Sequence, residues 1–367
     1  MNILEFLISP SDAAKRSGPH DKVVLSSRVR LARNIRGVPF PGHARKADRV
    51  RAFETLMPAV QSLNQVGSDA FAESMEKLSQ NEKKVLVERH LISREHEAKG
   101  VGSGIVLNRE ETLCLMVNEE DHLRMQALRP GLQLGQAWMS LDSVDTDLES
   151  RLEIAFSEQY GFLTACPTNL GTGIRVSAML HLPGLVLGEQ INQIIQAVSK
   201  LGLAVRGLFG EGTEALGNVF QVSNQMTLGE SELEIVERIN KVLLQIIEHE
   251  ENARLTLLEK KAKVLFNHIG RAYGTLANAH SISSKETMNQ LSLLRLGVDI
   301  GMIPGTPKSL VDELFLLSQP AHLQLKTPDK LDAEQRDMLR SDMLRDRMRE
   351  VARPDHLGVV IPPKAAA

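Results

Sequence analysis

The hydrophobic pattern of the chain changes character at Gly229, and this change limits the fold more than any other feature. Before it, short β-rich runs alternate with amphipathic stretches from residue 23 onward. The β-rich runs include 113–117, 174–182 and 219–222, and the amphipathic stretches include 133–156 and 188–200. This mixture predicts a mostly antiparallel sheet with helices packed against it.

After Gly229 the apolar residues recur with a helical period and β signals are few. The helical segments are 230–276, 284–296, 308–317 and 333–351, with breaks at Pro304-Gly305 and at Pro320. A chain of 367 residues is long enough for two domains. The pattern therefore predicts an α+β domain, with a mostly antiparallel sheet flanked by helices, followed by an all-α C-terminal domain.

Composition excludes several classes of protein. The only two cysteines, Cys114 and Cys166, form no CxxC pair, so neither a disulfide scaffold nor a zinc site is indicated. No apolar run approaches the roughly 18 residues of a membrane span, and the N-terminus lacks the basic region of a signal peptide. A net charge of −3 gives no drive toward nucleic acid or anionic membranes. A reducing, cytoplasmic location is expected.

The segment Cys-Pro-Thr-Asn-Leu-Gly-Thr-Gly-Ile-Arg at residues 166–175 combines several features of a ligand site. It joins the Cys166 thiol, a proline-fixed turn, two glycines and Arg175, which opens a β-rich run. Such a segment brings backbone close to an anionic ligand. A Cys-Pro turn before a strand is also common in ordinary loops. We interpret it as an active-site wall.

Arginines supply the candidate phosphate contacts. In the strand-like run 23–31, alternation places Arg28 and Arg30 on one face, roughly 6–7 Å apart, which suits a polyphosphate. A solvated strand face is the alternative. No GxxxxGK[ST] motif occurs, and the glycines at 100–104 are typical of a turn between strands. Other arginines at strand ends or in loops, each also explicable as a surface ion pair, are Arg124, Arg175 and Arg206.

The segment 166–175 closely resembles the signature of the guanidino (phosphagen) kinases, which move the γ-phosphoryl group of ATP to a guanidinium nitrogen, and Cys166 matches the signature cysteine. The segment 118–124, Asn-Glu-Glu-Asp-His-Leu-Arg, resembles the catalytic motif, which makes Glu120 the general base. Glu211 matches the second carboxylate, which grips the guanidinium. From residues alone, the segment 118–124 could be an ordinary acidic turn. Cys166 could likewise be a small, buried hydrophobic residue.

The resemblance also implies the ligands of the site. The arginines that match nucleotide-phosphate positions are Arg28, Arg30, Arg124, Arg175 and Arg206. Fixed guanidinium groups stabilise the negative charge on the γ-phosphoryl group while it is being transferred. The implied cofactors are ATP and Mg²⁺, and the ion is held mainly by nucleotide oxygens and waters, with no ligand from protein side chains.

Two departures point to one branch of this family. Metabolite guanidino kinases carry a helical domain ahead of the Ser-Ser-Arg-Val-Arg segment, which here begins at Ser26, and they lack the helical region after about Asn252. Both departures resemble the bacterial protein arginine kinases (McsB family). This implies a phosphagen-kinase-like catalytic domain at 1–252, a helical phosphoarginine-binding and dimerisation domain at 253–352, and a flexible tail at 353–367.

A second site is expected at residues 336–341. On a helix, Arg336 and Arg340 lie one turn apart, ready to grip a phosphoryl group, while Asp337 pairs with a guanidinium. The string resembles the RDxxRA phosphoarginine-binding motif of this branch, with Ser341 in place of alanine. A solvated charged helix is the alternative.

The leading hypothesis is an ATP-dependent protein arginine kinase with an allosteric phosphoarginine site. The resemblance implies substrates marked for a Clp-type unfoldase-protease, a zinc-binding activator protein as partner, and a homodimer. Two alternatives stay open: a kinase for free guanidino metabolites, and a phosphoarginine-binding adaptor without kinase activity. The sequence does not identify the substrate proteins or the residues that contact adenine.

Overall fold

The computed structural model describes Ile3, Leu7 and residues 17–207 and 215–355. The chain divides into two compact units that are interleaved in sequence. The first comprises Met1–Met179, Lys200–Ala204 and Val222–Leu243, and the second Leu180–Ser199, Val205–Gln221 and Leu244–Ala367. The predicted boundary between residues 252 and 253 stays a prediction, and residues 356–367 of the predicted tail lie outside the described residues.

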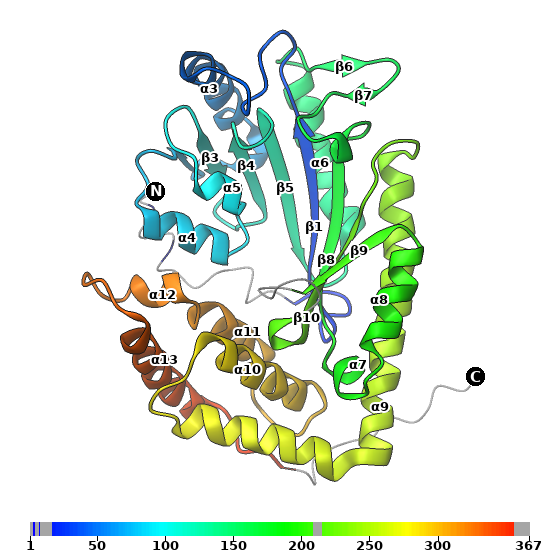
Figure 1. Ribbon diagram of the computed structural model, residues 1–367, viewed down its shortest axis with the longest axis vertical. Coiled ribbons are helices and arrows are strands. Elements are labelled where there is room, and N and C mark those ends of the chain that lie inside the picture. The colour runs from blue at the N-terminus through cyan, green and yellow to red at the C-terminus, as the bar shows by residue number, and fades with distance from the viewer. Residues whose placement is uncertain (1–2, 4–6, 8–16, 208–214, 356–367) are drawn as a thin grey trace. The chain divides into compact units, whose positions relative to one another are not determined.

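One eight-stranded sheet has the order β2-β3-β4-β5-β1-β8-β10-β9 (Figure 1). Its strands are β1 Val24–Arg33, β2 Phe71–Ser74, β3 Gly104–Leu107, β4 Leu113–Val117, β5 Leu123–Pro130, β8 Ile174–His181, β9 Leu203–Gly207 and β10 Val219–Asn224. The pairs β1/β5, β2/β3, β3/β4 and β4/β5 are antiparallel, as is the small hairpin of β6 Phe156–Ser157 and β7 Gly161–Phe162. The predicted antiparallel sheet is confirmed.

Strand β1 has two faces of opposite character. Val29 and Leu31 are buried at 0% and 1% exposure, whereas Arg28 and Arg30 alternate with them and are half-buried. In the β1/β5 register Ala32 stands opposite Arg124 of β5. Since Ala32 follows Arg30 by two residues, Arg124 shares a face with the two arginines.

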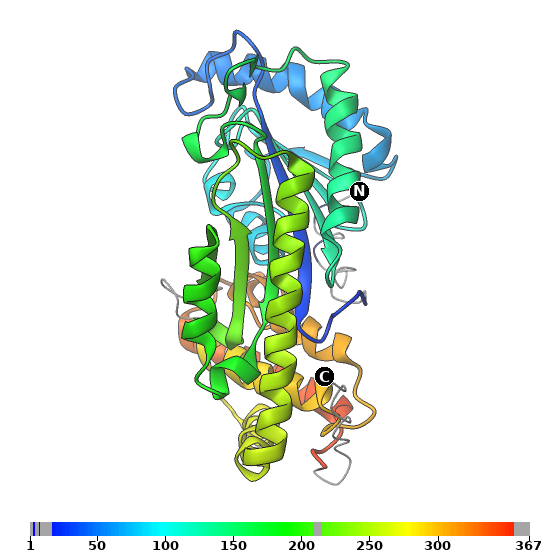
Figure 2. The same ribbon diagram turned by 90° about the vertical axis from the view of Figure 1, so that its right-hand side faces the viewer.

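Helices cover the apolar face of β1 in the first unit. The described helices that lie wholly in this unit are α3 Lys46–Gln61, α4 Gln80–Glu88, α5 Arg94–Glu97, α6 Leu134–Glu149 and the 3-10 turns η1 Asn64–Val66 and η2 Pro167–Asn169. Helix α6 packs against β1 and β5 (teal in Figure 2), and α3 packs against β3 and β4. Asp145 of α6 pairs at 2.5 Å with Arg33, which points away from Arg28 and Arg30.

Helix α6 is shorter than the amphipathic stretch at 133–156 predicts. It ends at Glu149, and the following residues pair with the segment after β1. Arg36 N donates to Glu153 O at 2.8 Å, and Ala155 N donates to Asn34 O at 2.7 Å. The last residues of the stretch therefore exchange helical hydrogen bonds for a tertiary pairing.

The second unit is mainly helical, as predicted for the region after Gly229. The helices that lie wholly or partly in it are α7 Pro183–Leu187, α8 Ile191–Lys200, α9 Glu232–Asn278, α10 Ser284–Asp299, α11 Lys308–Leu317, α12 Pro320–Gln324, α13 Ala333–Arg347 and the turns η3 Leu216–Asn218 and η4 Met348–Glu350. Their core includes Ile269, Leu291, Val311 and Leu344. Pro320 opens α12, because proline suits the first helical turn. In the described part of the chain, no helix has the length and apolarity needed to cross a membrane.

Candidate active site

Four of the predicted phosphate-binding arginines come together on one face of the sheet: Arg28, Arg30, Arg124 and Arg175, hereafter the arginine face. All four are half-buried. Burial, then the charges of Arg124 and Arg175, lower the pKa of Arg28 to about 10. Burial and the other three arginines hold the pKa of Arg30 well below its usual value. Such mutual repulsion is what a bound anion relieves.

Two contacts place Arg175 of β8. Ala32 N donates to Gly173 O at 3.0 Å. Arg28 Nε lies 3.4 Å from Ser177 Oγ. Residue numbers fall along β8 as they rise along β1, so the strands run antiparallel and Arg175 lies between these two contacts. The predicted segment 166–175 therefore places the guanidinium group of Arg175 on the arginine face.

The side chain of Arg30 is incompletely hydrogen-bonded within the part of the chain that the structure describes. Arg30 Nε is buried and has no hydrogen-bond partner among the residues that the structure describes. A buried donor left unsatisfied costs about 1–3 kcal/mol. Together with the depressed pKa of Arg30, this fits a site that an anionic oxygen completes.

The loop between α4 and α5 covers part of the arginine face. Gln126 Nε2, from β5, donates to His90 O at 2.9 Å and to Leu91 O at 2.8 Å. Burial and the nearby charge of Arg28 lower the pKa of His90 to about 4, so its imidazole is neutral at pH 7. Sequence reasoning missed His90, because a single loop histidine carries no pattern that links it to β1.

The carboxylate loop, residues 118–122, follows β4. Asn118 adopts a left-handed φ of 55°, and its side chain donates to Arg49 O and to Gly102 O at 2.9 and 2.7 Å. Asparagine tolerates this conformation better than most residues. These two bonds fix the turn that presents Glu119 and Glu120.

Glu119 is fully buried and holds its neighbours in place. Its carboxylate accepts from Arg124 Nη1 at 2.8 and 2.9 Å, from Glu120 N at 2.8 Å, and from the Ser93 hydroxyl. Burial alone raises the pKa of Glu119, but these donors outweigh it and lower that pKa. Glu119 is therefore an ionised anchor for Arg124 and for the backbone of Glu120.

Glu120 differs sharply from Glu119. Its side chain is 42% exposed, against 0% for Glu119, and Oε2 lies 3.8 Å from Arg124 Nη1. Partial burial and the charges of Asp121 and Glu119 raise the pKa of Glu120, although Arg124 opposes them. An accessible carboxylate with a raised pKa is suited to take up a proton.

Cys166 lies in the thiol loop, residues 164–172, just before the turn η2. The thiol is half-buried and contacts Thr168 Oγ1 at 3.0 Å. Ala165 N, next to the cysteine, donates to Asp121 Oδ1 at 2.6 Å, which ties the thiol loop to the carboxylate loop. Cys114, by contrast, is fully buried, and burial raises its pKa well above the usual value.

A cavity of about 490 Å³ lies beside the carboxylate loop. It is lined by Phe40, Gly42, His43, Glu95, Lys99, Glu119, Glu120, Arg124 and Ala165. It therefore holds the predicted base, Glu120, beside Arg124, a predicted phosphate-binding arginine, and reaches Ala165, the residue before Cys166. Phe40, Glu95 and Lys99 were not predicted, since they come from segments that are distant in sequence from both motifs.

Two predicted residues are not placed with this group. Arg206 is exposed on β9, in the part of that strand that belongs to the second unit. Glu211 lies outside the described residues. The roles expected for both stay predictions.

The predicted phosphoarginine site lies on α13. Arg340 is only 1% exposed, donates to Ser318 O and Ile282 O at 2.8 Å each, and pairs with Asp337. Arg336 is half-buried and donates to Leu331 O at 2.8 Å. The alternative of a solvated charged helix is wrong for Arg340, because its contacts fasten α13 to the rest of the second unit. Binding of phosphoarginine there stays a prediction.

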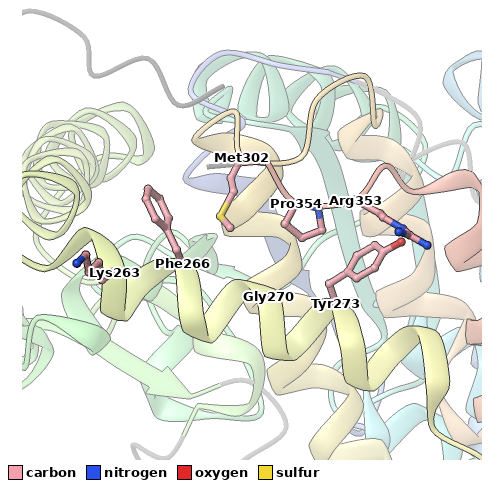
Figure 3. A pocket seen from close by; sticks show the side chains of 7 residues that line it. All are labelled: Lys263, Phe266, Gly270, Tyr273, Met302, Arg353 and Pro354. Atoms are coloured by element: carbon pink, nitrogen blue, oxygen red, sulfur yellow. The ribbon is translucent and has the colours of Figure 1, made fainter. Parts of the chain in front are cut away.

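A second cavity of about 480 Å³ lies in the second unit. Figure 3 shows its lining residues, Lys263, Phe266, Gly270, Tyr273, Met302, Arg353 and Pro354. These residues include two cations and two aromatic rings but no carboxylate. Among the described residues, this lining offers no carboxylate base for a guanidinium acceptor, unlike the cavity beside Glu120.

Comparisons with known families agree with this geometry. The sequence matches the family described as ATP:guanido phosphotransferase, C-terminal catalytic domain, over residues 52–253. It matches the family described as protein-arginine kinase McsB C-terminal domain over residues 262–358.

Solved structures of similar fold include two guanidino kinases. The duplicated taurocyamine kinase of Schistosoma mansoni, with bound components of a transition-state analogue, aligns with a TM-score of 0.58 and 27% identity over 65% of this chain and 35% of that one. A lombricine kinase aligns with a TM-score of 0.55 and 25% identity over 66% of this chain and 71% of that one. The expected phosphagen-kinase-like fold is confirmed.

Curated relatives identify the branch. The protein-arginine kinase of Desulforamulus reducens is 44% identical over 356 residues, which cover 96% of this chain and 99% of the relative. That of Bacillus subtilis is 44% identical over 337 residues, covering 91% and 92%. With similarity at this level along nearly its whole length, the chain belongs to the protein-arginine kinase family.

Proposed function

We propose that this protein transfers the γ-phosphoryl group of ATP to arginine side chains of protein substrates, through the residues described above. The observation that carries the proposal is the pairing of Glu120 with Arg124 in one cavity. There a half-exposed carboxylate with a raised pKa stands 3.8 Å from a guanidinium that belongs to the arginine face.

The arginine face is the proposed phosphate site. Arg28, Arg30, Arg124 and Arg175 orient the triphosphate and stabilise negative charge on the group being transferred, an effect worth about 10³–10⁵ in rate for one well-placed arginine. ATP supplies that group, and Mg²⁺ is expected to be held mainly by nucleotide oxygens and waters. The buried, unsatisfied Arg30 Nε supports the fit of these residues to a polyphosphate.

Glu120 is the proposed general base. A substrate guanidinium has a pKa above about 12, so it must lose a proton as its nitrogen attacks phosphorus. The N–P bond forms, the P–O bond to ADP breaks, and the proton passes to Glu120. Such a base contributes typically ~10²–10⁴ in rate. We assign Cys166 and Glu211 to the acceptor side, where they orient the guanidinium.

Replacing Glu120 tests this assignment. Glu120→Gln is expected to lower the rate of transfer by ~10²-fold or more and to leave the thermal midpoint unchanged, because the side chain is half-exposed. Glu54→Gln, at an exposed position of α3, is the matched control. Transfer of ³²P from labelled ATP to a casein-like protein, followed by acid treatment to reveal phosphoarginine, measures the rate. Normal turnover by the Glu120 variant would contradict the assignment.

The same assay separates the candidate activities. Acid-labile phosphate on protein arginine supports the proposed function. Transfer to free arginine alone would show a metabolite kinase instead. Tight binding of phosphoarginine without any turnover would show an adaptor.

The wider biological role is also a proposal. We propose a cytoplasmic homodimer that marks proteins for a Clp-type unfoldase-protease and is controlled by a zinc-binding activator and by phosphoarginine bound at α13. Similarity to protein-arginine kinases over nearly the whole chain supports a protein substrate. Degradation of a phosphorylated test protein by a reconstituted Clp protease, with and without this kinase, measures the marking role.

A further inference from the structure

Thr227 is buried, with 4% exposure, and lies three residues beyond the end of β10. Its hydroxyl donates to Leu170 O at 2.6 Å, with Thr168 O also within reach at 3.1 Å. Its main-chain oxygen accepts from the amide and the hydroxyl of Thr172, both at 3.1 Å. One residue thus binds the thiol loop at three positions.

The thiol loop is shaped to lie directly on Thr227. Gly171 has a φ of +105°, and a Cβ added to it would lie 2.5 Å from Thr227 O. Only glycine allows so close an approach at this φ. The two segments therefore touch backbone to backbone, with no side chain between them to absorb a shift.

This contact continues to the thiol of Cys166. The Thr168 carbonyl faces the Thr227 hydroxyl, and the Thr168 side chain contacts Cys166 Sγ at 3.0 Å. Asn169 N donates to Cys166 O at 3.0 Å, which closes a turn over residues 166–169. Thr227 contacts this same turn through the Thr168 carbonyl. A movement of residues 168–170 would therefore move the thiol.

We propose that Thr227 is a positioning residue for the phosphoryl-transfer reaction: through the thiol loop it fixes where the Cys166 thiol meets the acceptor guanidinium. This inference rests on the proposed function, which puts Cys166 on the acceptor side. Thr227 touches neither substrate nor nucleotide in this scheme. A displacement of about 1 Å in such a group costs on the order of 10²-fold in rate.

Two substitutions isolate the hydroxyl. Thr227→Val keeps the shape of the side chain and removes the donor, whereas Thr227→Ser keeps the donor and loses a methyl group. We expect Thr227→Val to lower kcat/KM for an arginine peptide by about tenfold or more, while KM for ATP stays within about twofold. Thr227→Ser is expected to stay within about threefold of the parent, because the hydroxyl is retained.

The chemical reactivity of the thiol gives a readout that needs no turnover. The rate of alkylation by iodoacetamide, measured across pH and assigned to Cys166 by peptide mass mapping, is expected to change in Thr227→Val and to be restored in Thr227→Ser. If the parent protein fails to phosphorylate protein arginine, the proposed function fails, but the alkylation comparison still tests the role of Thr227.

The inference would be overturned by either of two results. In the first, Thr227→Val lowers the thermal midpoint but leaves the alkylation profile and the acceptor kinetics unchanged. In the second, Thr227→Ser is as impaired as Thr227→Val. If Thr227→Val does not fold, Thr172→Val removes the hydroxyl bond from the loop side. A fall in acceptor kcat/KM supports the inference, and unchanged kinetics overturns it.

Discussion

Glu119 and Glu120 are adjacent in sequence, yet their pKa values shift in opposite directions. Glu119 is surrounded by donors from Ser93, Arg124 and the following amide, so its charged form is stabilised. Glu120 faces an open cavity and receives the repulsion of its acidic neighbours. Neutralising the buried carboxylate of Glu119 would weaken its hold on Arg124, so Glu119 supports the structure of the site, whereas Glu120 is the proposed base.

Glu95 provides a test of this electrostatic setting. It lines the same cavity as Glu120, and its charge contributes to the raised pKa of Glu120, alongside Asp121 and Glu119. Glu95→Gln removes one negative charge, so the pKa of Glu120 falls. Because the base must be ionised, the acidic limb of the kcat/KM profile moves to lower pH. Steady-state kinetics from pH 5 to 8 measures this shift.

Glu97 supplies the control for that experiment. It lies on the same helix, α5, but accepts from Gln80 Nε2 at 2.7 Å. Glu97→Gln is expected to leave the acidic limb in place. An acidic limb that stays in place in Glu95→Gln, or that moves to higher pH, would show that Glu95 does not act on the base.

At the scale of elements, hydrophobic period predicted most of the structure. The runs expected at 113–117 and 308–317 coincide with β4 and α11, because their pattern depends on local burial alone. The end of α6 was missed because residues 153–155 pair with residues 34–36, a contact between distant segments that no local pattern reveals.

The residues of the candidate site also fall into two groups, those that the sequence predicted and those that it did not. Motifs predicted Glu120, Cys166 and the four arginines of the arginine face, since each belongs to a string with recognisable chemistry. Thr227, His90 and Glu95 could not be predicted, because their proximity to those strings depends on how the strands and loops fold together.

Gly173 directly precedes β8, the strand that carries Arg175, and has a φ of +67°. An added Cβ would lie 2.7 Å from Ala32 O. Gly173→Ala is therefore expected to lower the free energy of unfolding by about 1–3 kcal/mol. It is also expected to displace Arg175, with loss of transfer activity. Urea denaturation and the kinase assay measure the two effects.

Gly135 is the matched control for that substitution. It lies in α6, with nothing within 4 Å of an added Cβ. Gly135→Ala is expected to stabilise the protein by up to about 1 kcal/mol, because alanine favours helix. Equal stability of the two variants would show that the close approach at Gly173 is relieved without strain.

At the scale of the whole molecule, the arginine face and the proposed phosphoarginine site occupy different units. The arginine face belongs to the first unit and α13 to the second. Arg340 is buried and bound to two main-chain oxygens, so its replacement would disturb the fold as well as any ligand site. A test of phosphoarginine binding is therefore cleaner at Arg336.

Arg336→Ala is expected to weaken binding of phosphoarginine by about tenfold or more, the loss of one charge-assisted hydrogen bond to a phosphoryl group. Calorimetric titration with phosphoarginine measures it. Arg349→Ala, at an exposed position of η4 in the same unit, is the control. Unchanged affinity in the Arg336 variant would place the receptor elsewhere.

The arginine face has a consequence for the thermodynamics of the entire fold. The charges of the four half-buried guanidinium groups lower the pKa of Arg28 and Arg30, and any anion that bridges the groups relieves this repulsion. Sulfate or ATP should therefore raise the thermal midpoint well above its value in chloride at equal ionic strength, following RT ln(1 + [L]/Kd). Differential scanning fluorimetry would then report nucleotide occupancy directly, so that melting temperature becomes a binding assay for this enzyme.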